Sequence, residues 1–201
     1  NIDGHNVLKT KGAIHYLTSE EIEKDKEYLF SISSKLKDKN IISLIIGGPT
    51  QYYDYSDRNI QEIFSKVNYL VKENNLNLVV IPSMRTPKGT IEHAKIYFGN
   101  DHLVLDGVDK KAYLSALSQS KHIVITCDSS SMISEAALTG KPIYIATIPP
   151  KKSDKRFKNF RKLFQEMKIV RELGEKLENW NYEKLDETNR VANIIKDKIQ
   201  L

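Results

Sequence analysis

The chain alternates between short apolar runs and longer segments in which apolar residues recur every three or four positions. The runs at 40–47, 76–82, 121–126 and 141–148 have the length of buried strands. In the segment 57–74 the apolar residues fall on one helical face: Ile60, Ile63, Phe64, Val67, Leu70 and Val71. Strands that alternate with helices in this way predict βαβ units and a mainly parallel sheet.

Residues that favour helix ends support this division. Thr18 and Glu21 form a capping-box pattern at the start of one helix. Thr86, which precedes a proline, and Asp109 are predicted N-caps of two others. Gly140 is predicted to end a helix. The predicted helices cover 19–36, 57–74, 87–98, 109–119, 131–139, 155–167 and 182–199. A short strand is expected over 102–105, and residues 6–17 are expected to form a strand or an arm.

Length and composition fit one folded domain over residues 1–201, without repeats or a dividing linker. No apolar run approaches the roughly 20 residues of a membrane span. The net charge of +5 invites a nucleic-acid partner, but the lysines are interspersed with acids and a basic stripe is lacking. The single cysteine excludes a disulfide framework and fits a reducing, cytoplasmic environment.

Polar residues that follow the predicted strands are candidates for a ligand site, because open parallel sheets bind ligands at the carboxyl ends of their strands. Gly47 and Gly48, with Thr50 close behind, follow the first strand. Paired glycines allow a phosphate to approach the backbone closely. The loop matches neither a dinucleotide-binding nor a P-loop pattern, and an ordinary turn is the alternative.

The second strand is followed by Ser83, Arg85 and Thr86. The Arg85 guanidinium offers a fork of donors that suits a phosphate, and the next helix begins here. The alternative is that Arg85 pairs with a nearby acid of the protein.

The segment after the fourth strand carries the strongest local signal: Asp128, Ser129, Ser130 and Ser131 precede a helix that contains Glu135. Free N–H groups and serine hydroxyls at a helix start favour an anion, and a carboxylate one turn later can bind a ribose diol. The alternative is that Asp128 or Ser131 caps the helix and Glu135 faces solvent.

No catalytic residue can be named from the sequence. The five histidines are widely separated, so no metal site and no cofactor are expected. Cys127 has no identifiable base as a partner and is interpreted as a small buried thiol.

Residues 126–144, with small polar residues before Glu135-Ala136 and then Gly140-Lys141-Pro142, resemble the donor-site signature of GT-B glycosyltransferases and UDP-sugar 2-epimerases. That resemblance implies pyrophosphate at residues 129–131 and ribose at Glu135. It likens Gly47-Gly48 to the glycine loop that opens the C-terminal domain of such enzymes. Here the residues after Gly48 depart from that loop, which weakens the case for phosphate contact there.

A closer resemblance, spread in order over nearly the whole chain, is to the plant mitochondrial-fission (elongated mitochondria) family and its bacterial relatives, described as predicted nucleoside-diphosphate-sugar epimerases. The matching pieces are Asn6-Val7-Leu8, 10–15, Leu17-Thr18, Gly47-Gly48, 83–87, Asp128-Ser129, 132–136, 140–142, Lys155, Phe157 and Phe160. The resemblance implies the C-terminal half of a GT-B-type protein. An N-terminal Rossmann-like domain is then expected before Asn1.

Two hypotheses follow for an α/β, Rossmann-like parallel sheet with helices on both faces. In the first, the domain binds a nucleotide diphosphate-sugar and does not turn it over alone. In the second, the scaffold is a non-enzymatic module that binds a protein through the basic segment 151–161. An open cleft that Glu135 faces favours the first, and a cleft blocked by Tyr52, Tyr53 or Tyr55 favours the second.

Overall fold

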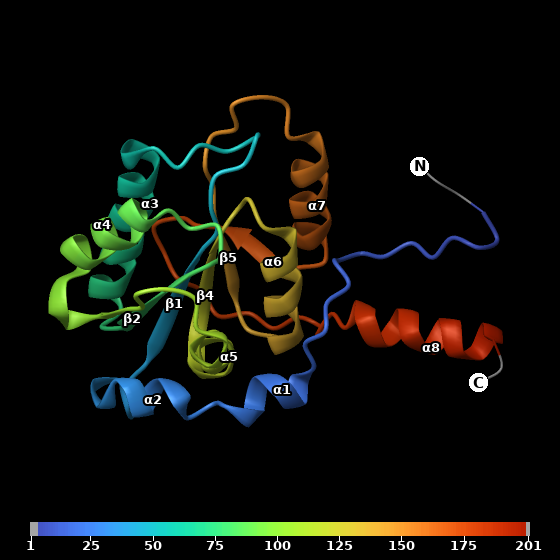
Figure 1. The fold of residues 1–201 in the computed structure, drawn as a ribbon, viewed down its shortest axis with the longest axis horizontal. Helices are drawn as coiled ribbons and strands as arrows, with labels where there is room; N and C mark the ends of the chain where they lie inside the picture. Colours follow the sequence, from blue (N-terminus) through green and yellow to red (C-terminus); the bar gives the residue numbers. More distant parts are fainter. Residues whose placement is uncertain (1–3, 200–201) are drawn as a thin grey trace.

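A six-stranded parallel sheet forms the centre of the computed structural model, which describes residues 4–199 (Figure 1). Its spatial order is β3-β2-β1-β4-β5-β6. The strands are β1 (Ile41–Ile46), β2 (Asn77–Pro82), β3 (Leu103–Val104), β4 (Ser120–Thr126), β5 (Ile143–Ala146) and β6 (Val170–Glu172). Every residue of β1 is buried, because helices cover both faces of the sheet, and this explains its uninterrupted apolar run.

Helices cover both faces of the sheet (Figure 1). One face carries α3 (Asp57–Glu73) and α4 (Lys88–Phe98). The other carries α5 (Lys110–Gln119), α6 (Ser130–Ala136) and α7 (Lys155–Glu166). The strand order reverses between β1 and β4, because β2 and β3 lie on one side of β1 and β4, β5 and β6 lie on the other. In open α/β sheets, ligands bind at such a switch point. The predicted fold class is confirmed.

The N-terminal helical region differs from the sequence-based prediction. Instead of one helix over 19–36, it forms α1 (Ser19–Lys24), α2 (Tyr28–Ile32) and a short 3-10 turn. Thr18 caps α1 by accepting from the Glu21 N–H. Ser115 of α5 donates to the Lys26 carbonyl at 2.5 Å and accepts from the Leu29 N–H at 3.1 Å. These contacts replace intrahelical hydrogen bonds, so tertiary packing interrupts the helix.

Two further predictions at the C-terminal end were wrong in detail. The last helix, α8 (Glu187–Ile199), begins five residues later than the predicted start at 182. Strand β6 lies in a segment for which no strand was predicted. Only three residues long, β6 is an edge strand with one buried residue, Val170, and so carries almost no hydrophobic pattern.

Helix α8 and the segment 4–17 project together from one side of the molecule (Figure 1). The segment 4–17 contains no strand among its described residues, and we call it the arm. Within the described part of the chain, no helix has the length and apolar character needed to cross a membrane.

Candidate ligand-binding site

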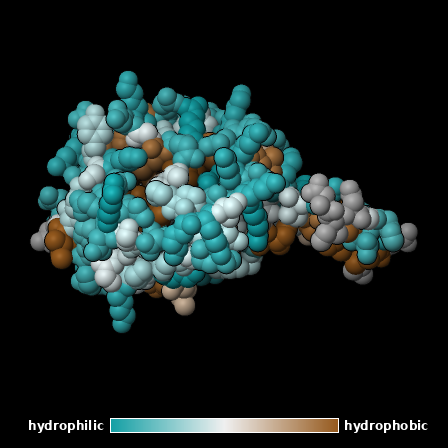
Figure 2. All heavy atoms as spheres, turned by 90° about the horizontal axis from the view of Figure 1, so that it is seen from above, coloured by the Kyte–Doolittle hydropathy of each residue, from teal (hydrophilic) through white to brown (hydrophobic). Residues whose placement is uncertain are grey.

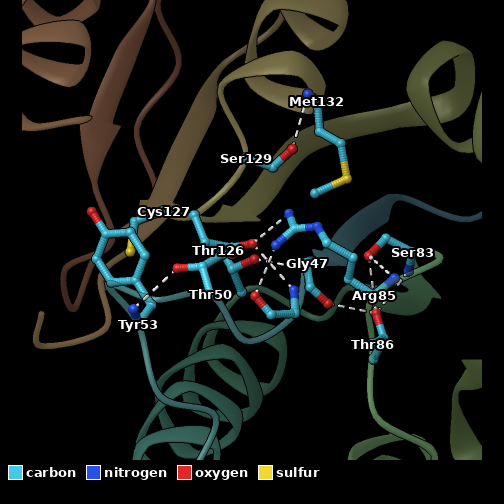
Figure 3. Close-up of polar contacts among 12 residues, drawn as sticks. Gly47, Thr50, Tyr53, Ser83, Arg85, Thr86, Thr126, Cys127, Ser129 and Met132 are labelled. Atoms are coloured by element: carbon cyan, nitrogen blue, oxygen red, sulfur yellow. Dashed lines mark hydrogen bonds and ion pairs between the residues drawn. The ribbon is translucent and has the colours of Figure 1, made fainter. Parts of the chain in front are cut away.

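The carboxyl ends of β1, β2 and β4 bring three predicted segments together (Figure 3). These are the glycine loop after β1, residues 83–86 after β2 and residues 128–131 after β4. Hydrogen bonds among Gly48, Arg85 and Asp128 join all three. The sheet therefore assembles at one edge the residues that the sequence singled out separately.

The Asp128 carboxylate, which is fully buried, is the centre of this assembly. It accepts hydrogen bonds from the Gly48 N–H at 3.1 Å, Arg85 Nη2 at 2.8 Å and the Tyr55 hydroxyl at 2.5 Å. Burial, followed by the nearby Asp128 charge, raises the pKa of Tyr55 far above its usual value, so Tyr55 remains a donor. A buried carboxylate with three donors is stable where an unpaired one would be costly.

Arg85 points back toward the glycine loop and the end of β4 (Figure 3). Its Nη1 donates to the Gly48 carbonyl at 3.0 Å, while its side chain keeps 42% of its surface exposed. The ion pair with a nearby acid, which the sequence left as an alternative, is therefore present. Any role of Arg85 in binding a ligand stays a prediction, because its guanidinium group already forms an ion pair with Asp128.

The glycines of the loop are explained by the protein's own packing. A side chain at Gly47 would overlap the Asp128 carboxylate, and one at Gly48 would overlap the Arg85 backbone. Both positions thus need glycine whether or not a phosphate approaches the loop.

The hydroxyls of Thr50, Ser83 and Thr86 also hold their own loops. Thr86 Oγ1 accepts from the Ser83 N–H at 2.8 Å and lies 2.6 Å from the Gly47 carbonyl, to which it donates. Ser83 Oγ accepts from the Arg85 N–H, and Thr50 Oγ1 accepts from the Tyr52 N–H. Because Thr86 is used in this way, it does not cap α4 as predicted, and Pro87 occupies the cap position without a side-chain hydrogen bond.

Ser129 is the N-cap of α6, where the sequence had suggested Asp128 or Ser131 as the structural alternative. Its hydroxyl accepts from the Met132 N–H at 3.4 Å. Ser130 is half-buried and Ser131 is exposed. The first N–H groups of a helix have no intrahelical partner, so those of Ser130 and Ser131 remain available to another acceptor.

Glu135 lies one turn further along α6 and is half-buried. One of its carboxylate oxygens, Oε2, accepts a hydrogen bond of 2.6 Å from the Tyr113 hydroxyl on α5. Burial and the Glu135 charge raise the pKa of Tyr113 well above its usual value, so Tyr113 remains the donor. No sequence pattern predicts this pair, because its members lie on different helices.

A cavity of about 320 Å³ opens beside Ser130, between the arm and α7. Two cationic side chains, Lys11 and Arg156, line it. The remaining lining consists of Thr10, Gly12, Ala13, Ser130, Phe157 and Phe160. The Ala13 N–H donates to Ser134 Oγ at 2.9 Å and thereby fixes the arm against α6. Sequence reasoning missed Lys11 and Arg156, because nothing local predicts that the arm meets α7.

A buried polar cluster holds α7 in place beside this cavity. The Tyr53 hydroxyl donates to Asp154 at 2.5 Å, Arg161 Nη2 pairs with Asp154 at 3.0 Å, and Arg161 Nη1 donates to Tyr53 at 2.8 Å. The Tyr53 hydrogen bond and the Arg161 guanidinium hold the pKa of Asp154 below its usual value. Tyr53 and Tyr55 are core residues, so neither is a lid over the cavity. Tyr52 is half-buried and packs edge-on against Phe157, and it is not among the lining residues.

Cys127 is buried beside this cluster, and its burial raises the pKa of the thiol to about 11. A protonated, inaccessible thiol is not a nucleophile at neutral pH. The interpretation of Cys127 as a small buried side chain agrees with this environment.

Two solved structures have a similar fold. The UDP-GlcNAc 2-epimerase of Neisseria meningitidis, solved with UDP-GlcNAc bound, matches with a TM-score of 0.50 and 14% identity, over 90% of this chain and 42% of that one. A Listeria monocytogenes protein assigned as a UDP-N-acetylglucosamine 2-epimerase matches with a TM-score of 0.51 and 16% identity, over 94% and 42%. At this identity the likeness establishes the fold alone, which is an α/β Rossmann-like parallel sheet.

Proteins that are similar in sequence identify the family of this chain more specifically than the similar folds do. An uncharacterized protein of Rickettsia prowazekii is 28% identical over 209 residues, covering 97% of this chain and 56% of the relative. Mitochondrial fission protein ELM1 of Arabidopsis thaliana is 26% identical over 206 residues, covering 96% of this chain and 46% of the relative. The chain thus spans about half the length of these curated relatives. Because the model of the family "Mitochondrial fission ELM1" matches residues 1–199, the chain belongs to that family.

Proposed function

We propose that this domain binds a nucleotide diphosphate-sugar in the cavity between the arm, α6 and α7, as the donor-binding half of a GT-B-type protein. The observation that carries the proposal is the pairing of two cations, Lys11 and Arg156, with the start of α6 around one cavity of about 320 Å³. A volume of this order suits a small ligand.

A diphosphate group fits the chemistry of this cavity. The amide groups at the start of α6 supply donors, and Lys11 and Arg156 supply positive charge from two sides. Arg85 is held by Asp128 at 2.8 Å, so in this proposal it supports the loop and the phosphates rely on the other two cations.

The ribose would bind at Glu135, which does not line the cavity and faces Tyr113 of α5, so the nucleoside would extend from the cavity along α6. Tyr113 holds Oε2 of this carboxylate and fixes the orientation of the group, which leaves Oε1 to accept from a ribose hydroxyl. The bound UDP-GlcNAc of the Neisseria protein, whose fold is similar, supports a nucleotide-sugar as the ligand class. The acceptor and any catalytic base would belong to the other half of the protein, so we expect binding without turnover.

A thermal-shift screen against UDP, GDP, ADP, CMP and their sugar conjugates tests the proposal. A ligand that binds only the folded state stabilises it by about 2.7 kcal/mol at a hundredfold excess over Kd. We expect one nucleotide series to raise the melting temperature, and Arg156→Ala and Glu135→Ala to remove most of that rise. The matched control is Lys158→Ala, an exposed cation on the same helix that does not line the cavity.

If Arg156→Ala and Lys158→Ala changed the ligand-induced rise in melting temperature equally, the cavity would be excluded as the binding site. If the full-length protein showed no thermal shift with any of the nucleotides, nucleotide-sugar binding itself would be overturned. The second candidate function would then be preferred: a non-enzymatic module that binds an acidic protein partner. The exposed basic side chains of segment 151–161 favour this candidate: Lys151, Lys152, Lys155, Arg156 and Lys158.

A further inference from the structure

Hydrophilic side chains dominate the body of the domain on the face that Figure 2 shows. One polar surface segment, the bend between β3 and α5, contains the pair Asp106-Gly107, which the function proposed above does not use. In an aspartate-glycine pair the backbone nitrogen can attack the side-chain carboxyl group, because glycine has no Cβ to hinder the approach. The surroundings of the pair decide whether the folded chain permits this reaction.

The bend is fixed at both ends and open between them. The Leu105 N–H donates to a carbonyl of β2 at 3.1 Å, and the Asp109 carboxylate caps α5 by accepting from the Ala112 N–H at 3.0 Å. Between these anchors, 87% of the Asp106 side chain is exposed. Apart from its chain neighbours, nothing lies within 4 Å of the position where a Cβ on Gly107 would be. The bend therefore has room to bring the Asp106 carboxyl carbon to the Gly107 nitrogen.

The Gly107 nitrogen has no competing contact. Among residues 4–199, no carbonyl or side chain accepts a hydrogen bond from the Gly107 N–H. A backbone N–H that is held in a hydrogen bond must give up that bond before its nitrogen can react. Gly107 does not face this obstacle.

One ion pair opposes the attack. Lys95 Nζ on α4 lies 2.5 Å from Asp106 Oδ1 and 3.3 Å from Glu92 Oε1, so its charge is shared between two carboxylates. Both partners of the Lys95–Asp106 pair are accessible to solvent, and water and salt weaken such a pair. The pair draws the Asp106 carboxylate toward α4 without fixing it, so it slows the reaction and does not prevent it.

Asp128, which is followed by Ser129, has the opposite surroundings. Its carboxylate is fully buried and is held by donors from Gly48, Tyr55 and Arg85. Because these contacts prevent the carboxylate from turning toward the next backbone nitrogen, Asp128 is an internal reference that should not react.

We propose that Asp106-Gly107 is a site of spontaneous aspartate isomerisation in the folded protein, and that the ion pair with Lys95 slows it. The Gly107 nitrogen forms a bond to Asp106 Cγ. The proton of the nitrogen and the hydroxyl of the carboxyl group leave as water, which gives a cyclic imide. Water then adds to a carbonyl of the imide and reopens it. Opening at the backbone carbonyl gives isoaspartate, with no net change in composition and no co-reactant besides water.

Isomerisation would disturb the start of α5. The main chain of isoaspartate runs through the side chain and is one carbon atom longer, and this extra atom lies shortly before the cap residue Asp109. A displaced cap no longer satisfies the free N–H groups of the first turn. We therefore expect the Ala112 amide to exchange with solvent faster in the isomerised protein.

Incubation of the folded protein at neutral pH in water enriched in heavy oxygen tests the proposal. Each passage through the imide adds a heavy oxygen atom to residue 106, because ring opening takes its oxygen from the solvent. Digestion in ordinary water and mass spectrometry then locate the label. We expect label at Asp106, a separate chromatographic peak for the isoaspartyl peptide, and no label at Asp128.

Three variants make the test specific. Asp106→Glu keeps a charge beside Lys95 but would have to close a larger ring, so the label should be lost. Lys95→Met releases the Asp106 carboxylate from α4 and should increase the rate of labelling. The control, Lys66→Met, removes an exposed lysine of α3 and should leave the rate unchanged. Unchanged melting temperatures would show that these surface substitutions leave the fold intact.

A synthetic peptide of residues 103–110 provides the rate for the segment outside the fold. Label in the peptide but not at Asp106 of the folded protein would overturn the proposal, as would label that persists at residue 106 in Asp106→Glu. Equal rates in the parent and in Lys95→Met would overturn the part given to the ion pair. No nucleotide enters the experiment, so its outcome is independent of the proposed ligand site.

Discussion

The Asp128 carboxylate joins loops that lie about 40 to 80 residues apart in the sequence. Its position explains why two glycines follow β1, since side chains there would overlap Asp128 or the Arg85 backbone. A glycine pair that resembles a phosphate-binding loop is therefore needed here by the fold itself. The same residues cannot serve as independent evidence for a ligand.

Alanine substitutions at two glycines test this explanation. Gly48→Ala should destabilise the protein by about 1–3 kcal/mol, because the new methyl group overlaps backbone atoms that cannot move freely. Gly89→Ala, in α4 with open space where the new methyl group would lie, should stabilise it by about 0.5 kcal/mol through helix propensity. Urea unfolding measures both. A neutral Gly48→Ala would contradict the tight packing described for this loop.

At the level of single residues, the sequence predicted which segments meet at the carboxyl ends of the strands better than it predicted their interactions. Rules for strand ends placed residues 47–50, 83–86 and 128–131 at one edge of the sheet, where they lie. The rules could not decide whether Arg85 faces a ligand or an acid, because Asp128 is 43 residues away in the sequence. Whether these residues bind a ligand stays a prediction.

Helix α7 is positioned by a polar cluster and not by its apolar face alone. Tyr53, Asp154 and Arg161 form three mutual hydrogen bonds in a buried environment. Because Arg156 and Phe160 on the same helix line the cavity, this cluster fixes one cavity wall.

Removal of one hydroxyl tests the importance of this cluster. Tyr53→Phe should destabilise the protein by about 1–2 kcal/mol, because Asp154 and Arg161 each lose a buried partner. Tyr69→Phe, on the exposed surface of α3, should stay within about 0.5 kcal/mol of the parent. Chemical denaturation of both variants gives the comparison, and equal stabilities would show that the cluster contributes little.

The junction between the arm and α8 should respond to acid. The hydrogen bond from Arg190 holds the pKa of Glu187 below its usual value. A carboxyl group of this kind stabilises the folded state above its unfolded pKa of about 4.3, and the contribution is lost as the pH falls through the lower folded value. The arm should therefore loosen from α8 below about pH 4.3. The Lys11 amide resonance would report this change.

Two variants make the acid response specific. Glu187→Gln cannot ionise, so the acid-dependent change at Lys11 should disappear. Glu183→Gln removes an exposed carboxylate nearby and should leave the change in place. An acid transition that persists in Glu187→Gln would assign it to another group.

At the level of elements, the hydrophobic pattern predicted the strands and helices that build the buried core. The pattern failed where burial is one-sided or absent. The helix over 19–36 is broken by hydrogen bonds from α5, and β6 has only one buried residue. The N-terminal part of the predicted helix 182–199 is irregular and instead lies against the body, with Leu185 in the core.

For the whole molecule, the ligand cavity and the exposed helix are connected through the arm. Residues 10–13 line the cavity, and His5 and Lys9 contact α8. A shift of α8 and a ligand that enters the cavity would therefore each affect the same segment.

The pairing of the arm with α8 also determines how the domain would respond to mechanical force. Both ends of the described chain emerge on one side, and the His5 carbonyl and Lys198 Nζ are 3.3 Å apart near the tip of the pair. A pull on the two ends would load these contacts one after another, as in opening a zipper, before any strand of the sheet bears tension. The arm and α8 would separate at low force, while the parallel sheet would keep its fold until they had come apart.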